Sequence, residues 1–299
     1  MTSSYAAYEV EQLYRDYKPL LISIAYRMLG SMSEAEDVVQ DVFVTVSKLD
    51  GIGIEHPKAY LVKLLTNRVL NVMKSAPRQR ESYPGEWLPE PVSDSEPESS
   101  PLDNVIQHEQ LGYALLVLLQ TCTPPERAVF VLRESFGYEY AEIAAMLDKS
   151  EAACRKIFSR ASAKVGHASV TESKESLDES MSQFVQSFSQ AIYTGRLENF
   201  IHLLTDDAVM ITDGGGIVRS ALNPIYGAER IAAFIEGIAR KGAFEGTWKH
   251  VSVSGQQGIL LVRDNKPVKV YLFEPDEDTK LIRAVYVISN PEKLTRIHE

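Results

Sequence analysis

The spacing of the apolar residues changes once along the chain, and this change constrains the fold more than any other feature. Up to about residue 165, apolar residues recur at helical spacing, as in Leu13, Tyr17, Leu20, Ile24 and Met28. Near the C-terminus, short strand-like runs follow one another: "KHVSVSG", "GILLVRD", "KPVKVYLFEP" and "IRAVYVIS". A chain of 299 residues with both patterns predicts helical domains followed by a compact α+β domain.

Composition excludes several classes of protein. No apolar run approaches the roughly 20 residues that span a bilayer, and the N-terminus lacks the pattern of a signal peptide. The chain has only two cysteines, Cys122 and Cys154, so we expect a reduced, cytoplasmic setting without membrane association. The six histidines are scattered, and the sequence predicts neither a metal site nor a cofactor.

The acidic net charge of -10 conceals two basic elements, one within residues 58–80 and one around Arg155. Residues 81–110 contain eight acidic residues and no basic one, so this short segment supplies most of the acidity. Residues 58–80, by contrast, contain six basic residues and no acidic one. Local surfaces can therefore still attract nucleic acid, although the whole chain is acidic.

Composition also divides the chain into segments. We expect helical domains at 1–80 and 102–167, an acidic linker rich in Pro and Ser at 81–101, a polar linker at 168–177, and the α+β domain at 178–299. The linker at 81–101 is expected to have little core of its own. Ser33 is a candidate cap for a helix within the first domain.

The segment "YAEIAAMLDKSEAACRKIFSRA", from Tyr140 to Ala161, predicts two short helices joined by a polar turn. In the second helix, one apolar stripe contains Cys154, Ile157, Phe158, Ala161 and Val165. The remaining arc carries Arg155, Lys156 and Arg160, and Ser150 is a natural N-cap. This arrangement suits a DNA-recognition helix. The alternative is an ordinary helical hairpin with a solvated charged face.

A second basic helix is expected from Pro57 to about Ser75. Its apolar stripe comprises Leu61, Leu64, Leu65, Val69 and Val72. Lys63, Asn67 and Lys74 lie opposite, with Tyr60 and Asn71 at the edge, whereas Arg68 falls close to the stripe and could be paired internally. Cations supply phosphate affinity, and Asn and Tyr can bond or stack with exposed bases. A solvated face is again the alternative.

The order of these parts resembles a known family. "SMSEAEDVVQDVFVTVSKL", "HPKAYLVKLLTNRVLNVMKS" and "TPPERAVFVLRESFGYEYAEIAAMLDKSEAACRKIFSRA" resemble regions 2 and 4 of sigma-70-type factors of the extracytoplasmic-function (ECF) class. "WLPEP", "DGGG" and "NPEKL" resemble marks of its SigJ-like group, in which a SnoaL-like domain of the NTF2-like fold follows. Glu292 stands where that group more usually has Asp. The implied fold is two all-α sigma domains, one a helix-turn-helix bundle, followed by an NTF2-like cone.

The resemblance implies a role for each basic or acidic helix. Asp37, Gln40 and Asp41 match the helix that docks on the clamp helices of the β′ subunit of core RNA polymerase. The Gly51–Pro57 loop and the helix with Tyr60, Lys63, Asn67 and Asn71 match the elements that read the opened −10 promoter strand. The −35 duplex would be read by Ser150, Glu151, Arg155, Lys156 and Arg160. Residues 126–133 and 136–140 would lie near the polymerase β flap.

The resemblance also implies that the C-terminal domain replaces a separate anti-sigma partner and tunes activity within a chain that is monomeric when free. We expect three segments to meet each other or the sigma domains. Their residues are Trp87, Pro89, Glu90 and Pro91; Asp213, Gly214, Gly215 and Gly216; and Asn290, Pro291, Lys293 and Leu294.

Two other classes of function stay open at this point. One is a conventional helix-turn-helix regulator whose cone senses a small molecule. The other is an enzyme in which Asp206, Asp207 or Asp213 acts as a general base. Against the enzyme, Asp206 and Asp207 are expected in a turn and Asp213 in a tight glycine loop, so we predict that the chain catalyses no reaction.

Overall fold

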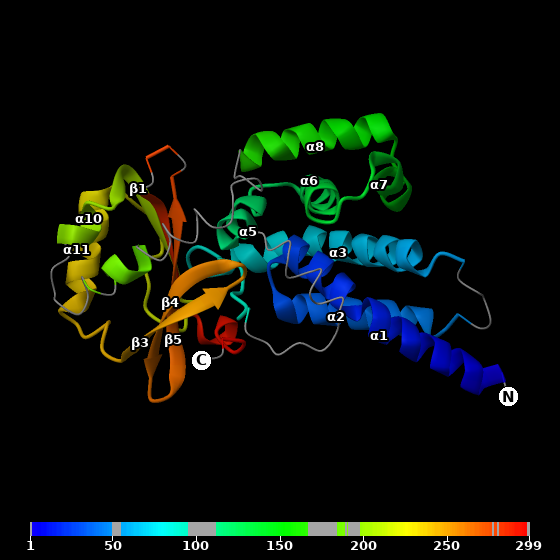
Figure 1. The fold of residues 1–299 in the computed structure, drawn as a ribbon, viewed down its shortest axis with the longest axis horizontal. Helices are drawn as coiled ribbons and strands as arrows, with labels where there is room; N and C mark the ends of the chain where they lie inside the picture. Colours follow the sequence, from blue (N-terminus) through cyan, green and yellow to red (C-terminus); the bar gives the residue numbers. More distant parts are fainter. Residues whose placement is uncertain are drawn as a thin grey trace. The chain divides into compact units, whose positions relative to one another are not determined.

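The computed structural model describes residues 2–49, 55–94, 112–166, 184–188, 190, 198–276, 278–279 and 281–297. The chain divides into two compact units, each described separately below (Figure 1). The helical unit comprises Met1–Gln79, Pro97–Leu111 and Leu115–Ala168, and the sheet unit comprises Arg80–Glu96, Gly112–Ala114 and Ser169–Glu299. Among the described helices, none has the length and apolar character needed to span a membrane.

The helical unit begins with α1 (Thr2–Leu29) and α2 (Met32–Val46). Gly30, with φ 75°, ends α1, and the next helix starts almost at once. Ser31 rather than the expected Ser33 caps α2, because its Oγ accepts the Glu34 amide at 3.4 Å. The apolar side of α2 is buried, which leaves its acidic side facing outward. The buried residues are Ala35, Val38, Val39, Val42, Phe43 and Val46.

Helix α3 (Pro57–Glu81) starts with proline, whose missing N–H costs nothing at a helix N-terminus. Its buried face includes Leu61, Leu65 and Val69, as the periodicity predicts. Leu64 and Val72, which were expected in the same stripe, are only half-buried. Val62, Thr66 and Met73 are buried instead, so the core-facing stripe is rotated slightly from the predicted one.

The second half of the helical unit contains α5 (Tyr113–Leu119), whose first two residues belong to the sheet unit, followed by α6 (Pro124–Phe130), the π-helix η1 (Val131–Ser135), α7 (Tyr140–Leu147) and α8 (Glu151–Val165). Asp148 reverses the chain between α7 and α8 by adopting the left-handed conformation at φ 53°, which Asp tolerates better than most residues. Ser150 then caps α8, since its Oγ accepts the Ala153 amide at 3.2 Å. The predicted helix-turn-helix is therefore present.

The sheet unit is built on a six-stranded sheet with strand order β2-β1-β6-β5-β4-β3. The strands are β1 (Leu204–Asp213), β2 (Ile225–Tyr226), β3 (Thr247–Val253), β4 (Gln256–Arg263), β5 (Lys266–Pro275) and β6 (Ile282–Ile288). All neighbours are antiparallel except β1 and β6, which are parallel. Two-residue turns at 254–255 and 264–265, all with positive φ, close the hairpins that follow β3 and β4.

Strand β1 is the main element that sequence patterning missed. Asp206 and Asp207 lie exposed on this strand and not in the expected turn. The pairing of β1 with β6 shifts register between Leu204 and Val209, and this irregularity obscures the alternation by which a strand is recognised.

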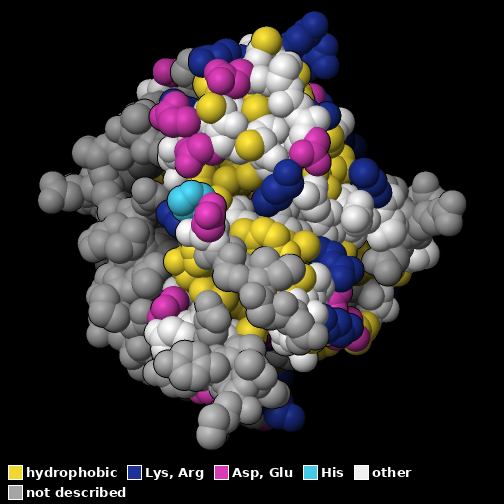
Figure 2. Space-filling view, turned by 90° about the vertical axis from the view of Figure 1, so that its right-hand side faces the viewer, with side chains coloured by type: hydrophobic (Ala, Val, Ile, Leu, Met, Phe, Trp, Pro, Cys, Tyr) yellow, Lys and Arg dark blue, Asp and Glu magenta, His cyan; other side chains and the backbone are white. Residues whose placement is uncertain are grey.

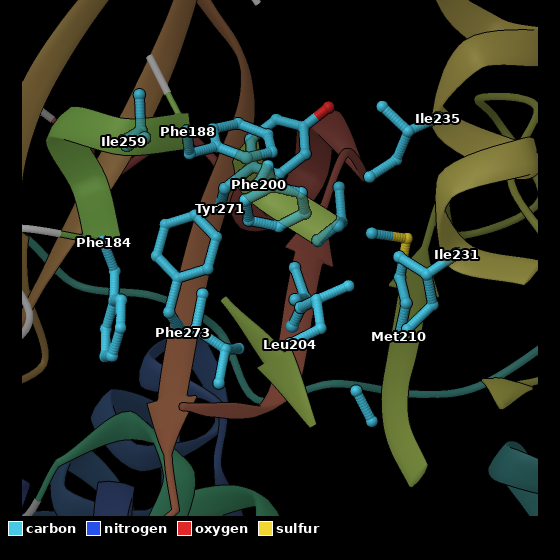
Figure 3. Close-up of a cluster of buried hydrophobic side chains, with 14 of the residues drawn as sticks. Phe184, Phe188, Phe200, Leu204, Met210, Ile231, Ile235, Ile259, Tyr271 and Phe273 are labelled. Carbon is cyan, nitrogen blue, oxygen red and sulfur yellow. The ribbon is translucent and has the colours of Figure 1, made fainter. Parts of the chain in front are cut away.

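Helices pack on one face of the sheet and enclose an aromatic core (Figure 3). Helix α11 (Ala228–Ala239) contributes Ile231 and Ile235, and α10 (Glu198–Ile201) contributes Phe200. The rings of Phe188 and Phe200 meet edge to face with centroids 4.8 Å apart. Tyr271 is buried in the same cluster, yet no hydrogen-bond partner is present for its hydroxyl in the described structure.

Part of the expected linker is folded into the sheet unit. Leu88, Pro89, Glu90 and Pro91 are buried, contrary to the expectation of a segment with little core. Ser93 forms an antiparallel bridge with Val253 on the edge strand β3. Composition misled here because the hydrogen-bond partners of this segment, Asp213 and Ser254, lie more than 100 residues away in the sequence.

We predict opposite effects of hydroxyl removal at two buried tyrosines. Tyr271→Phe should raise the free energy of unfolding of the sheet unit by about 1 kcal/mol or more, since a buried hydroxyl without a partner costs about 1–3 kcal/mol. Tyr113→Phe is the matched control, because the Tyr113 hydroxyl donates to the Pro89 carbonyl at 2.6 Å. It should lower stability by about 1 kcal/mol. Calorimetry on the full chain measures both, and equal losses would contradict the prediction.

Candidate nucleic-acid interface and linker-binding site

The acidic side of α2 is exposed to solvent. Asp37, Gln40 and Asp41 all lie on it, because the opposite side of the helix forms core. Arg68 on α3 approaches Asp41 with 3.7 Å between Nη1 and Oδ2, and both side chains are about half exposed or more. Arg68 is thus on the surface, paired with α2. An exposed pair of this kind contributes about 0–1 kcal/mol.

A polar stripe runs along the exposed side of α3. Tyr60 and Asn71 are exposed, whereas Lys63 and Asn67 are half-buried. Their spacing of three to four residues places all four on one side of the helix. The loop expected to precede this helix lies mostly outside the described residues, so only the helical part of the predicted −10 surface is described.

Lys63 already has a partner within the helical unit. Its Nζ lies 3.0 Å from Oδ1 of Asp148, the residue that reverses the chain before α8. Lys58 lies 5.5 Å from the ring centroid of Tyr138, which precedes α7. A contact between the polar stripe of α3 and the helix-turn-helix is therefore present.

Arg127 forms a second, buried contact between the two halves of the helical unit. This arginine on α6 is 3% exposed. Its Nη1 donates to the Met28 carbonyl near the end of α1 at 2.8 Å, and to Oε1 of Gln120 at 3.0 Å. A buried guanidinium needs such acceptors, and here they come from both halves of the helical unit.

The basic side of α8 is exposed. Ser150, Glu151, Arg155, Lys156 and Arg160 all face solvent. Arg155 lies 3.6 Å from Glu151 and 4.4 Å from the ring centroid of Tyr140. Figure 2 shows Lys and Arg side chains interspersed with Asp and Glu among the described residues of one face. Such a mixture favours contacts at particular helices over broad non-specific attraction.

In the sheet unit, the centre of the candidate site is the carboxylate of Asp213, at the end of β1. Its side chain is fully buried and accepts four hydrogen bonds. Oδ1 accepts from the Tyr83 hydroxyl at 2.6 Å and the Gly215 amide at 3.0 Å, and Oδ2 accepts from the Leu88 amide at 2.9 Å and Lys293 Nζ at 2.7 Å. Burial, and next the bond to Asp213, raises the pKa of Tyr83, so its hydroxyl stays protonated and donates.

Lys293 completes this site from the C-terminal helix η2 (Pro291–Lys293). Besides Asp213, its ammonium donates to the Leu88 carbonyl at 2.5 Å and lies 4.1 Å from the ring centroid of Trp87. The ammonium thus has a carboxylate, a carbonyl and an aromatic face around it. Two of these three, the Leu88 carbonyl and the Trp87 ring, come from the linker. Lys293 binds the carbonyl of Leu88 and Asp213 binds its amide, so both backbone polar groups of Leu88 are held.

Glycines allow the three segments to approach closely. At Gly215, with φ 62°, an added Cβ would lie 2.3 Å from the Asn290 amide nitrogen. At Gly216, with φ 72°, it would lie 2.7 Å from the Pro84 ring. Side chains at either position would push the segments apart.

The predicted meeting of the "WLPEP", "DGGG" and "NPEKL" segments is confirmed. Asn290 donates to the Tyr83 hydroxyl at 3.0 Å, and Leu294 is buried beside Lys293 in sequence, whereas Pro291 is exposed. The Glu90 carboxylate lies 3.5 Å from Arg296. The regulatory role of these residues remains a prediction.

Sequence reasoning missed Tyr83 and Asp94. The Asp94 carboxylate accepts from the Ser252 hydroxyl at 2.6 Å and the Gly255 amide at 3.1 Å, which fixes the linker to the turn between β3 and β4. The only local signal was that an aromatic and a carboxylate flank the proline-rich motif. No group of His, Cys, Asp and Glu suited to a metal ion occurs among the described residues.

Comparisons with known proteins identify the family of this chain. Residues 13–79 match the family model for sigma-70 region 2, and residues 113–165 match that for sigma-70 region 4. The ECF RNA polymerase sigma factor SigJ of Mycobacterium tuberculosis is 32% identical over 221 residues, covering 74% of this chain and 70% of SigJ. The probable ECF RNA polymerase sigma factor SigI of the same species is 28% identical over 229 residues, covering 76% of each chain.

The solved structure of M. tuberculosis SigJ matches with a TM-score of 0.74 at 27% identity, covering 95% of this chain and 97% of SigJ. The match extends through the C-terminal domain, so the fold class expected from the sequence is confirmed. The chain therefore belongs to the ECF sigma factors, which direct RNA polymerase to promoters.

Proposed function

We propose that this sigma factor reads two promoter elements with α8 and α3, holds core polymerase with α2, and is tuned by its own sheet unit through the linker. The observation that carries the regulatory part is the capture of residues 83–94 by Asp213, Lys293 and the edge of β3. The domain would take the place of a separate anti-sigma factor.

The roles of the helices rest on exposure and chemistry. The basic side of α8 can approach a duplex, with Ser150 and Glu151 at its N-terminus and Arg155, Lys156 and Arg160 along it. The α3 stripe offers Tyr60 for stacking and Lys63, Asn67 and Asn71 for phosphates and base edges of an opened strand. Asp37, Gln40 and Asp41 suit a basic polymerase surface.

Geometry supports a closed free state that must open on DNA. The positions −35 and −10 are about 25 base pairs apart, which is roughly 85 Å of duplex at about 3.4 Å per base pair. In the helical unit, however, Lys63 of the −10 stripe touches Asp148, two residues before the cap of α8. One sigma factor cannot contact both elements until these helices separate.

The linker sets how far they can separate. An extended chain spans at most about 3.3–3.6 Å per residue, so holding residues 83–94 on the sheet unit removes up to about 40 Å of reach. Release of this segment would lengthen the connection between the two sigma regions. Capture of the linker thereby couples the C-terminal domain to promoter binding without any ligand.

A catalytic role for the sheet unit has less support. Asp213 accepts four hydrogen bonds and is fully buried, which leaves little capacity for a proton from a substrate. Asp206 and Asp207 are exposed on β1. We propose that the chain is not an enzyme.

The test of this function is transcription from purified components. Core polymerase with the full chain should initiate at a two-element promoter, and Lys156→Ala should weaken initiation and reduce the salt slope of promoter binding by about 1. Arg240→Ala is a control, because it removes an exposed cation at the C-cap of α11 in the sheet unit, which is not part of any helix proposed to contact DNA. No initiation by either the full-length or a C-terminally trimmed chain would favour a conventional regulator instead.

We also predict strong coupling within the buried pair. Asp213→Asn and Lys293→Met should each destabilise the sheet unit by about 3–5 kcal/mol, because each leaves one buried charge unpaired, and the double variant should recover part of the loss. In a Trp248→Phe background, Asp213→Asn should also make Trp87 fluorescence more accessible to an acrylamide quencher.

Asp206→Asn is the matched control for this experiment, as it alters an exposed carboxylate on the same strand and should change neither property. The proposed binding of the linker by Asp213 and Lys293 would be wrong if Asp213→Asn left both the stability of the sheet unit and the quenching of Trp87 at the values of the unaltered chain.

A further inference from the structure

Arg155 differs from the other cations of α8 in having an aromatic neighbour. Its guanidinium carbon lies 4.4 Å from the ring centroid of Tyr140, the first residue of α7. The Tyr140 ring is itself held edge-on to Phe158 with centroids 6.0 Å apart, and Phe158 stacks on Phe130 at 5.8 Å. A chain of aromatic contacts thus connects the buried side of α8 to one of its exposed cations.

Two local groups contact Arg155 at the same time. The first is the Tyr140 ring, and the second is the Glu151 carboxylate at 3.6 Å, one helical turn earlier. These contacts use different parts of the guanidinium. A carboxylate occupies the N–H donors that a phosphate or guanine would need, whereas an aromatic ring contacts the flat face and leaves the donors on the edge available.

We propose that Tyr140 is a positioning residue for promoter recognition, which holds the flat face of the Arg155 guanidinium and leaves Glu151 no closer than 3.6 Å, so that N–H donors on the guanidinium edge stay available to the −35 duplex. This inference rests on the proposed role of α8. A stacked arginine has also lost part of its rotamer freedom before binding, so less entropy is lost when it meets DNA.

Arg133 keeps the other side of this cluster in place. Its guanidinium carbon lies 5.0 Å from the Tyr140 ring centroid, and the side chain is fixed by Glu139 at 3.0 Å and by the Tyr138 carbonyl at 3.0 Å. The ring of Tyr140 therefore has neighbours from η1 and α8. Its orientation depends on these contacts and not on its own hydroxyl.

The experiment uses the full chain with core polymerase at a promoter selected with the same holoenzyme. Binding is measured on that promoter and on variants with single substitutions across the −35 element. Tyr140→Leu should weaken binding about 2- to 5-fold, the range expected for an exposed cation–π contact. Tyr140→Phe keeps the ring and should retain binding close to that of the unaltered chain.

The preference for particular base pairs of the −35 element distinguishes loss of Arg155 positioning from damage to the helix-turn-helix. Tyr140→Leu and Arg155→Ala should weaken discrimination at the same base pairs, and the double variant should be no worse than Arg155→Ala alone. Loss of discrimination across the whole −35 element would indicate a damaged helix-turn-helix and would overturn the inference. Glu151→Gln added to Tyr140→Leu should restore part of the binding, since the competing carboxylate is then neutral.

The results also distinguish failure of this inference from failure of the proposed function. If Arg155→Ala weakens −35 recognition but Tyr140→Leu does not, the positioning role is wrong and the function stands. If Arg155→Ala leaves −35 recognition unchanged, the assignment of Arg155 and the inference fail together.

Discussion

A fully buried carboxylate must be paired or it destabilises the fold by several kcal/mol, and Asp213 is such a group. The sheet alone does not provide enough partners. Of its four donors, Gly215 lies two residues further along the chain and Lys293 comes from near the C-terminus, whereas Tyr83 and Leu88 belong to the linker. The need to satisfy one charge therefore orders a segment that composition alone describes as unstructured. The sheet unit is incomplete without residues from between the two sigma regions.

Under the proposed function, this dependence would give the C-terminal domain a physical means of control. The linker cannot serve both as part of the sheet unit and as a free connection of full length between the sigma regions. Contacts within the helical unit would oppose promoter binding in a similar way. Lys63 and Arg127 each join the first half of this unit to the half that contains the helix-turn-helix, and under the proposed function these halves separate on a promoter. The Lys63–Asp148 pair is exposed, so polymerase and DNA phosphates can replace this contact at modest cost.

Helical periodicity could be read from the sequence because each helix is amphipathic by itself. The exposed faces of α2, α3 and α8 follow from local spacing, as do the hairpins of β3 to β5. Strand β1 could not be found, because its partner β6 lies about 70 residues later and its register is irregular. Ser31 replaced Ser33 as a cap because Gly30 fixed where the helix restarts. Tyr83 and Asp94 act through partners 130 and 158 residues away, which no local pattern reports.

The most direct test of the account is hydrogen exchange at the Leu88 amide, which donates to Asp213 at 2.9 Å. In the free chain this amide should be strongly protected, to a degree similar to the central strands of the sheet unit. In a promoter complex with core polymerase, protection should fall while that of the sheet strands persists. Rapid exchange in the free chain, or unchanged protection in an actively initiating complex, would contradict control through linker capture.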